Sequence, residues 1–130
     1  STARRYECGS LVMPSLWGMH AALTTLLEFG MEAIENQIRA LTQILTEQLV
    51  QSGMFSLLSP VESHERAGIV TVKLRSGIDP QPVMNSLSGK GITLALREGK
   101  FRLSPHFYNS PEEMTTVVSA LCDAGAAPML

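Results

Sequence analysis

Two arginines, Arg97 and Arg102, lie five residues apart around a glycine turn in the last third of the chain. Arg102 belongs to the short run 101–104, which is typical of a strand, and a loop with His106 and Asn109 follows it. A guanidinium group presents a planar fork of N–H donors that binds a carboxylate through two hydrogen bonds, which Lys cannot copy. Arg102 is therefore a candidate anchor for a carboxylate, and the alternative is a surface arginine or a structural one that bonds loop carbonyls.

The polar neighbours of Arg102 are weaker candidates for the same site. Arg97 could make a second carboxylate contact, although we expect it to support the loop. His106 could act as an acid or base, but in a Ser-Pro-His-x-Tyr loop a structural hydrogen-bonding role is the commoner one. Asn109 could contact the carboxylate or orient Arg102, and it could equally close the turn before the next helix. We expect Tyr108 to pack.

The composition excludes several classes of protein. The 130 residues are 45% hydrophobic and 17% charged, which is typical of one folded domain. The net charge of −2 gives no basic footprint, so we expect no nucleic-acid partner. No apolar run reaches membrane-spanning length, and we expect no membrane partner. Cys8 and Cys122 stand at opposite ends without metal-ligand spacing, which favours free thiols in a cytoplasmic protein and no metal site.

The hydrophobic periodicity predicts helices and short strands in an α+β order. Asp79 before Pro80 and Ser110 before Pro111 are helix-start signals. We expect helices at 16–29, 32–52, 80–89 and 111–124, and strands at 54–58, 68–74, 92–96 and 101–104. The last two strands read as a hairpin. The predicted fold is a two-layer α+β domain, with a small, mainly antiparallel sheet, helices packed on one face, and a long helix before it.

The segment 97–113, which reads REGKFRLSPHFYNSPEE, resembles the C-terminal segment of class V aminotransferases. These are fold type I pyridoxal-phosphate enzymes, among them cysteine desulfurases, kynureninases and isopenicillin-epimerase-like lyases. The segment 4–10, RRYECGS, is similar to the family's Arg-Phe-Glu-x-Gly-Thr segment. The resemblance runs from about residue 4 to residue 121. It implies that the chain, which begins without Met inside a family motif, is a C-terminal fragment of a longer polypeptide.

The resemblance also implies a domain division and site residues. Residues 1–30 would be an N-terminal segment and linker helix to a missing large domain, 31–124 the small C-terminal domain, and 125–130 a tail. Arg102 would pair with the α-carboxylate of an amino-acid substrate. Gly9 and Ser10 would reach across a homodimer interface to the phosphate of the neighbouring subunit's cofactor, with Ser10 where the family usually has Thr.

The implied cofactor, pyridoxal 5'-phosphate, needs a lysine for its Schiff base. None of Lys73, Lys90 and Lys100 has the family's catalytic-lysine context, so we expect the fragment alone to bind no cofactor and to be inactive. Desulfurases of the family carry a nucleophilic Cys between the glycine turn and Arg102, and this chain has none there. That favours a transaminase, epimerase or C–S lyase over a persulfide-forming desulfurase.

Two other functions stay open at the level of the sequence. The chain could be a stand-alone regulatory α+β domain that binds an amino acid or another carboxylate, with Arg102 still the anchor. It could instead be an interaction module that uses the apolar stripe of the helix 32–52. We expect that stripe to be core packing; its members are Ile34, Ile38, Leu41, Leu45 and Leu49.

Overall fold

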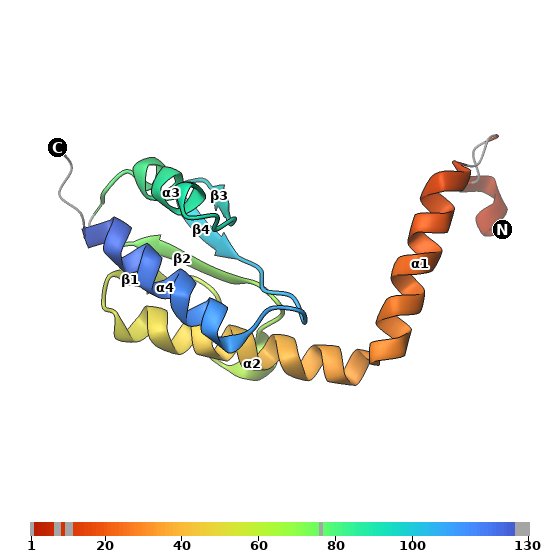
Figure 1. Ribbon diagram of the computed structural model, residues 1–130, viewed down its shortest axis with the longest axis horizontal. Coiled ribbons are helices and arrows are strands. Elements are labelled where there is room, and N and C mark those ends of the chain that lie inside the picture. Colours follow the sequence, from red (N-terminus) through yellow and green to blue (C-terminus); the bar gives the residue numbers. More distant parts are fainter. Residues whose placement is uncertain (1, 7–8, 10–11, 76, 127–130) are drawn as a thin grey trace. The chain divides into compact units, whose positions relative to one another are not determined.

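The computed structural model describes residues 2–6, 9, 12–75 and 77–126, which divide into two compact units, 1–34 and 35–130. The first unit contains a 3-10 helix, Ala3–Tyr6, and helix α1, Met13–Phe29 (Figure 1). Helix α1 begins three residues earlier than the apolar spacing predicts, because Pro14 fits its first turn. It has no buried residue, although its sequence is mostly apolar.

The second unit is built on a four-stranded antiparallel sheet with strand order β1-β2-β4-β3. The strands are β1 (Phe55–Leu57), β2 (Val70–Leu74), β3 (Ala95–Arg97) and β4 (Lys100–Leu103). The expected hairpin of the last two strands is confirmed, with Leu96 opposite Phe101. Strand β3 begins three residues later than expected because the Ile92 N–H still bonds the Leu87 carbonyl of the preceding helix, at 3.0 Å.

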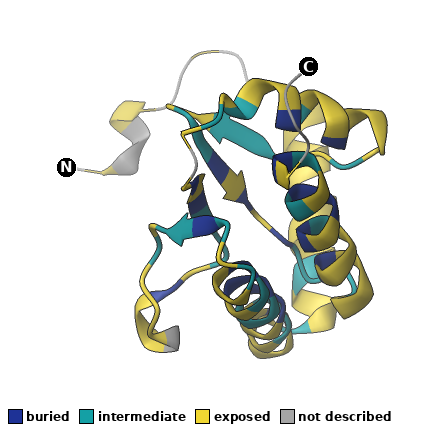
Figure 2. Cartoon of the chain, turned by 90° about the vertical axis from the view of Figure 1, so that its left-hand side faces the viewer, coloured by how far each residue is buried: buried dark blue, intermediate teal, exposed yellow. Residues whose placement is uncertain are grey.

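Three helices contribute to the core of this unit: α2 (Met31–Gln51), which belongs to it from Glu35 on, α3 (Pro80–Gly89) and α4 (Pro111–Ala126). Alternate residues of the strands join residues of these helices in one buried cluster (Figure 2). The apolar stripe of α2 is core packing as expected, since its Leu41, Leu45 and Leu49 are fully buried. The two-layer α+β fold, with helices on one face of the sheet, is confirmed.

Both predicted helix-start signals form. The side chain of Asp79 accepts a hydrogen bond from the Gln81 N–H at 3.0 Å and caps α3. At α4, the Ser110 hydroxyl accepts from the Glu113 N–H at 3.2 Å, while the Glu113 carboxylate accepts from the Ser110 N–H at 2.8 Å. This reciprocal pair is a capping box. Among the described residues, no helix has both the length and the apolarity to cross a bilayer.

Gly125 lies inside α4 and is buried, whereas the sequence suggested a tail from this residue on. A Cβ at this position would stand 3.1 Å from Leu74 Cδ2 and 3.2 Å from Met54 Cε. The last turn of α4 therefore packs directly on the end of β2.

Replacing Gly125 by leucine should destabilise the fold, because the added side chain overpacks a filled site. We expect the free energy of unfolding to fall by about 1–3 kcal/mol in urea denaturation followed by circular dichroism. Gly89→Leu is the matched control at the end of another helix, since a Cβ there meets nothing within 4 Å. Equal losses in the two variants would contradict the close approach at Gly125.

Candidate carboxylate-binding site

Arg102 lies on the exposed face of the sheet because β4 alternates. Its neighbours Phe101 and Leu103 are buried in the core on the other face, at 0% and 4% exposure. In the register of the sheet, Arg102 stands opposite Thr71 on β2 and opposite Ala95 on β3. Both flanking side chains are small, so they leave the guanidinium group open to solvent.

Arg102 and Arg97 differ from the other arginines of this unit in having no partner among the described residues. Arg39 pairs with Glu35 at 2.7 Å. Arg75 donates from Nε to the Phe55 carbonyl at 2.9 Å. Arg66 is buried, and its Nη1 donates to the Thr46 hydroxyl at 2.7 Å. The structural role considered for Arg102, bonding to loop carbonyls, is not seen.

The turn between β3 and β4 brings Arg97 to the same face as Arg102. Glu98 and Gly99 occupy the two turn positions with φ of 50° and 72°. Two left-handed residues give a hairpin turn whose twist matches the strands, and glycine adopts this conformation without steric cost. Arg97 then stands opposite Lys100, whose Nζ pairs with Glu98 Oε2 at 3.1 Å.

The loop after β4 is closed by Asn109. Its Oδ1 accepts a hydrogen bond from the His106 N–H at 2.8 Å, and its Nδ2 donates to Glu113 Oε2 at 3.1 Å. Its carbonyl accepts from Gln37 Nε2 at 3.2 Å. Both ends of the side-chain amide are thus engaged in the turn. A contact between Asn109 and a substrate stays a prediction.

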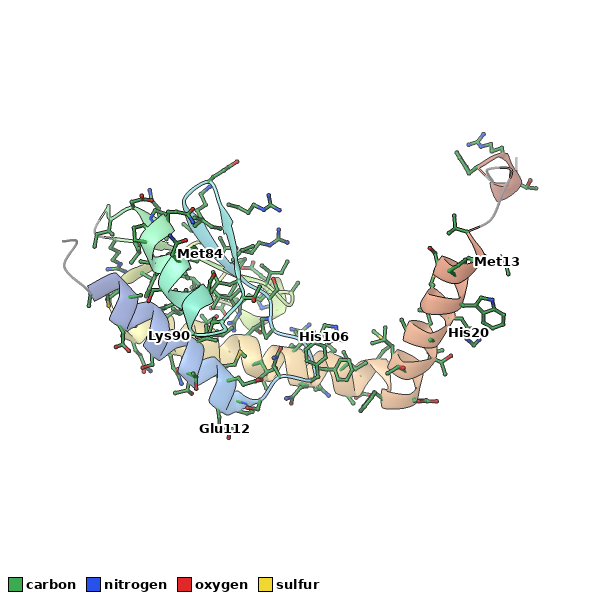
Figure 3. All side chains as sticks on the ribbon, turned by 45° about the horizontal axis from the view of Figure 1, so that its top comes forward. Met13, His20, Met84, Lys90, His106 and Glu112 are labelled. Atoms are coloured by element: carbon green, nitrogen blue, oxygen red, sulfur yellow. The ribbon has the colours of Figure 1, made fainter. Side chains whose placement is uncertain are left out.

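His106 stands in an aromatic cluster of the same loop (Figure 3). Its ring stacks on Tyr108 with 4.6 Å between centroids and contacts Phe107 at 4.8 Å. Its Nδ1 is buried and has no hydrogen-bond partner among the described residues. Tyr108, expected to pack, contacts only its loop neighbours His106 and Phe107, and 75% of its surface is exposed.

A groove of about 350 Å³ lies on the other side of β4, between the 91–94 segment, the 103–105 segment and α4. Asn109 and Glu113 line its polar rim, and Leu45 and Met114 its apolar wall. Neither Arg97 nor Arg102 reaches it. The structure therefore divides the predicted residues between the exposed sheet face, which holds the two arginines, and the loop, which holds His106 and Asn109.

The remaining predicted residues, Gly9 and Ser10, belong to the first unit. Gly9 is exposed, and Ser10 lies outside the described residues. The structure adds one residue that the sequence reasoning passed over. Lys73 is exposed on β2, and continuing the β2–β4 register by one residue places it opposite Lys100. The alternation of the 68–74 strand was the signal that could have placed it on this face.

Residues 1–117 match the family described as Aminotransferase class-V, so the chain belongs to this family. An uncharacterized aminotransferase of Bacillus subtilis (strain 168), YcbU, is 24% identical over 119 residues, covering 92% of this chain and 31% of the relative. The chain thus spans about a third of that relative's length.

Solved structures share the fold. Cysteine desulfurase from Thermococcus onnurineus NA1 matches with a TM-score of 0.85 and 24% identity over 95% of this chain and 34% of that protein. The cystine C–S lyase C-DES, solved with its product cysteine persulfide, matches with a TM-score of 0.81 and 22% identity over 92% of this chain and 32% of the lyase. A further structure of C-DES carries glycine linked covalently to its PLP cofactor.

The family is one of pyridoxal-phosphate enzymes, whose cofactor forms a Schiff base with a lysine. Lys73 and Lys90 are exposed, and Lys100 pairs with Glu98. None of the three lysines lines the groove. The described residues also contain no group of three side chains able to hold a metal ion. A Schiff-base lysine in an enclosed pocket is thus not provided by this part of the molecule.

The capping box of α4 leads us to predict how the thermal stability of the fold depends on pH. Hydrogen bonds from the Ser110 N–H and then the Asn109 amide hold the pKa of Glu113 below its ordinary 4.5. A carboxyl group whose pKa is lower in the folded than in the unfolded state stabilises the fold at pH values above its unfolded-state pKa. This stabilisation is lost as the pH falls through its folded-state pKa. We expect Glu113→Gln to reduce the loss of thermal stability between pH 7 and pH 3. An unchanged loss would contradict the role of this carboxylate; Glu47→Gln, on the exposed side of α2, is the control.

Proposed function

We propose that this chain is the C-terminal domain of a longer pyridoxal-phosphate-dependent enzyme, and that Arg102 anchors the α-carboxylate of its amino-acid substrate. The observation that carries the proposal is an exposed guanidinium group without a partner among the described residues, flanked by the small side chains of Thr71 and Ala95. Membership of the class-V family, and a length of about a third of the relative's, support it.

The contribution of Arg102 is to bind and orient. A bidentate pair fixes both the position and the rotation of the carboxylate. Holding one end of the substrate in this way determines which Cα bond faces the reacting group, and this orientation accounts for part of the rate. Lysine offers a point charge on a flexible stem and cannot fix the rotation.

Helix α1 supports a further part of the proposal, namely that residues 1–30 link this domain to a large domain. Its large apolar side chains are exposed, and an apolar helix surface of this extent is stable in water only when other surfaces cover it. They include Leu16, Trp17, Met19, Leu23 and Leu27. In the longer enzyme, Gly9 and Ser10 would approach the cofactor phosphate of the second subunit of a homodimer.

The reaction we propose is a transamination, an epimerisation or a C–S lysis, rather than that of a desulfurase that forms a persulfide on a cysteine of its own. The turn between β3 and β4 consists of Glu98 and Gly99, and no cysteine stands between Arg97 and Arg102. Cys122 is half-buried in α4 and packs against the core. The fold shared with a cysteine desulfurase does not supply the missing thiol.

The substitution Arg102→Lys in the enzyme produced from the whole reading frame tests the anchor. Because a charged hydrogen-bonding pair is worth about 1.5–3 kcal/mol, we expect kcat/KM to fall by ~10- to 100-fold. Arg39→Lys is the matched control, since Arg39 pairs with Glu35 on the exposed side of α2. A kcat/KM for Arg102→Lys within about twofold of the parent would refute the anchor.

We expect the chain produced by itself to be inactive and to self-associate. With added pyridoxal phosphate and a set of amino acids we expect no turnover, because the described residues offer no enclosed lysine. We expect self-association in sedimentation velocity through the apolar α1, reduced by Leu23→Glu. Asn85→Glu, on the exposed side of α3, is the control, because it adds the same charge. Turnover by the chain alone, or a monomer at all concentrations, would contradict the corresponding part of the proposal.

A further inference from the structure

The exposed face of the sheet carries an unusual row of cations. In the register of the sheet, its three cations are Lys73 on β2, Lys100 on β4 and Arg97 on β3, and the neutral Ser56 on β1 ends the row. Arg102 belongs to the next row along the strands, between Thr71 and Ala95. No acidic residue occupies this face of the four strands.

Such a row costs stability unless an anion is bound to it. Like charges that stand directly opposite on neighbouring strands are destabilising. Lys100 is the one member of the row with an ion partner among the described residues, and that partner, Glu98, lies in the turn. Neither Lys73 nor Arg97 has an ion partner among the residues that the structure describes. Their charges are therefore available to a ligand.

The register also fixes how these charges surround Arg102. Arg97 stands opposite Lys100, which precedes Arg102 by two residues on β4, so Arg97 is a diagonal neighbour of Arg102. Lys73 is the corresponding diagonal neighbour on the β2 side. Diagonal neighbours are about 7–8 Å apart, which long side chains can span. A ligand held at Arg102 thus has a cation within reach on either side.

We propose that the substrate is an acidic amino acid, whose α-carboxylate binds Arg102 and whose second carboxylate binds Arg97, with Lys73 adding a second positive charge. The proposal deepens the proposed function and rests on it, since it places the α-carboxylate at Arg102. Arg97 is then a specificity-determining residue, because it distinguishes an acidic side chain from a neutral one of the same shape.

Binding of dicarboxylates to the enzyme from the whole reading frame, saturated with its cofactor, tests this inference. Isothermal titration calorimetry compares succinate and glutarate with their monoamides, succinamate and glutaramate, which differ from them in one charge. We expect the diacids to bind ~10-fold or more tightly than the monoamides, as one charge-assisted contact allows. Arg97→Gln should bring the ratio close to one, and Lys73→Gln should lower it in part.

The control is Lys90→Gln, which removes a cation just after α3, away from the strands of the sheet (Figure 3), and should leave the ratio unchanged. A monoamide that binds as tightly as its diacid, or a ratio that survives Arg97→Gln, overturns the inference. If Arg102→Lys still weakens both ligands in that case, the carboxylate anchor stands and only the substrate class fails. If Arg102→Lys binds each ligand as tightly as the parent does, the carboxylate anchor itself is contradicted.

Discussion

The alternation of β4 is the constraint on which the rest of the site depends. Phe101 and Leu103 are held in the core by the helices on one face, so Arg102 between them must lie on the other. A shift of the register by one residue would bury the guanidinium group and expose both apolar side chains. The aromatic edge contact between Phe55 and Phe101, with 6.4 Å between centroids, adds to the fixing of this register from the core side.

The two ends of β4 are secured in different ways. At its start, the Glu98–Gly99 turn fixes the pairing with β3 and therefore the position of Arg97. At its end, Asn109 joins the loop to the capping box of α4, since Glu113 accepts from both the Asn109 amide and the Ser110 N–H. The strand that carries Arg102 is thus fixed by hydrogen bonds at both ends, as the proposed anchor requires.

Local signals in the sequence predicted most of the fold. The caps at Asp79 and Ser110, the apolar stripe of α2 and the final hairpin each follow from a few neighbouring residues. The start of β3 was misplaced because a local hydrogen bond from the Ile92 N–H back to the Leu87 carbonyl continues the C-terminal cap of α3 beyond Gly89 and delays the strand. The end of α4 was misplaced because Gly125 is kept for its close approach to β2, which the sequence alone does not show.

The candidate site was predictable only in part. The motif identified Arg102 and Arg97, but Lys73 joins them through the pairing of β2 with β4, whose members lie far apart in sequence. The sequence left two roles for Asn109 equally open, a substrate contact and a turn. In the structure, its side chain makes hydrogen bonds within the turn. The fold and the motif place Arg102 on the exposed face of the sheet. Its role as an anchor and the reaction are proposals about a longer protein, since the chain spans about a third of the length of its relatives.

The most direct test of the central claim is a crystal structure of the enzyme from the whole reading frame with its cofactor and a bound amino-acid analogue. The account predicts both α-carboxylate oxygens at about 2.7–2.9 Å from the guanidinium nitrogens of Arg102. An analogue whose carboxylate is held by other groups, with Arg102 facing solvent or paired with a carboxylate of the protein, would contradict it.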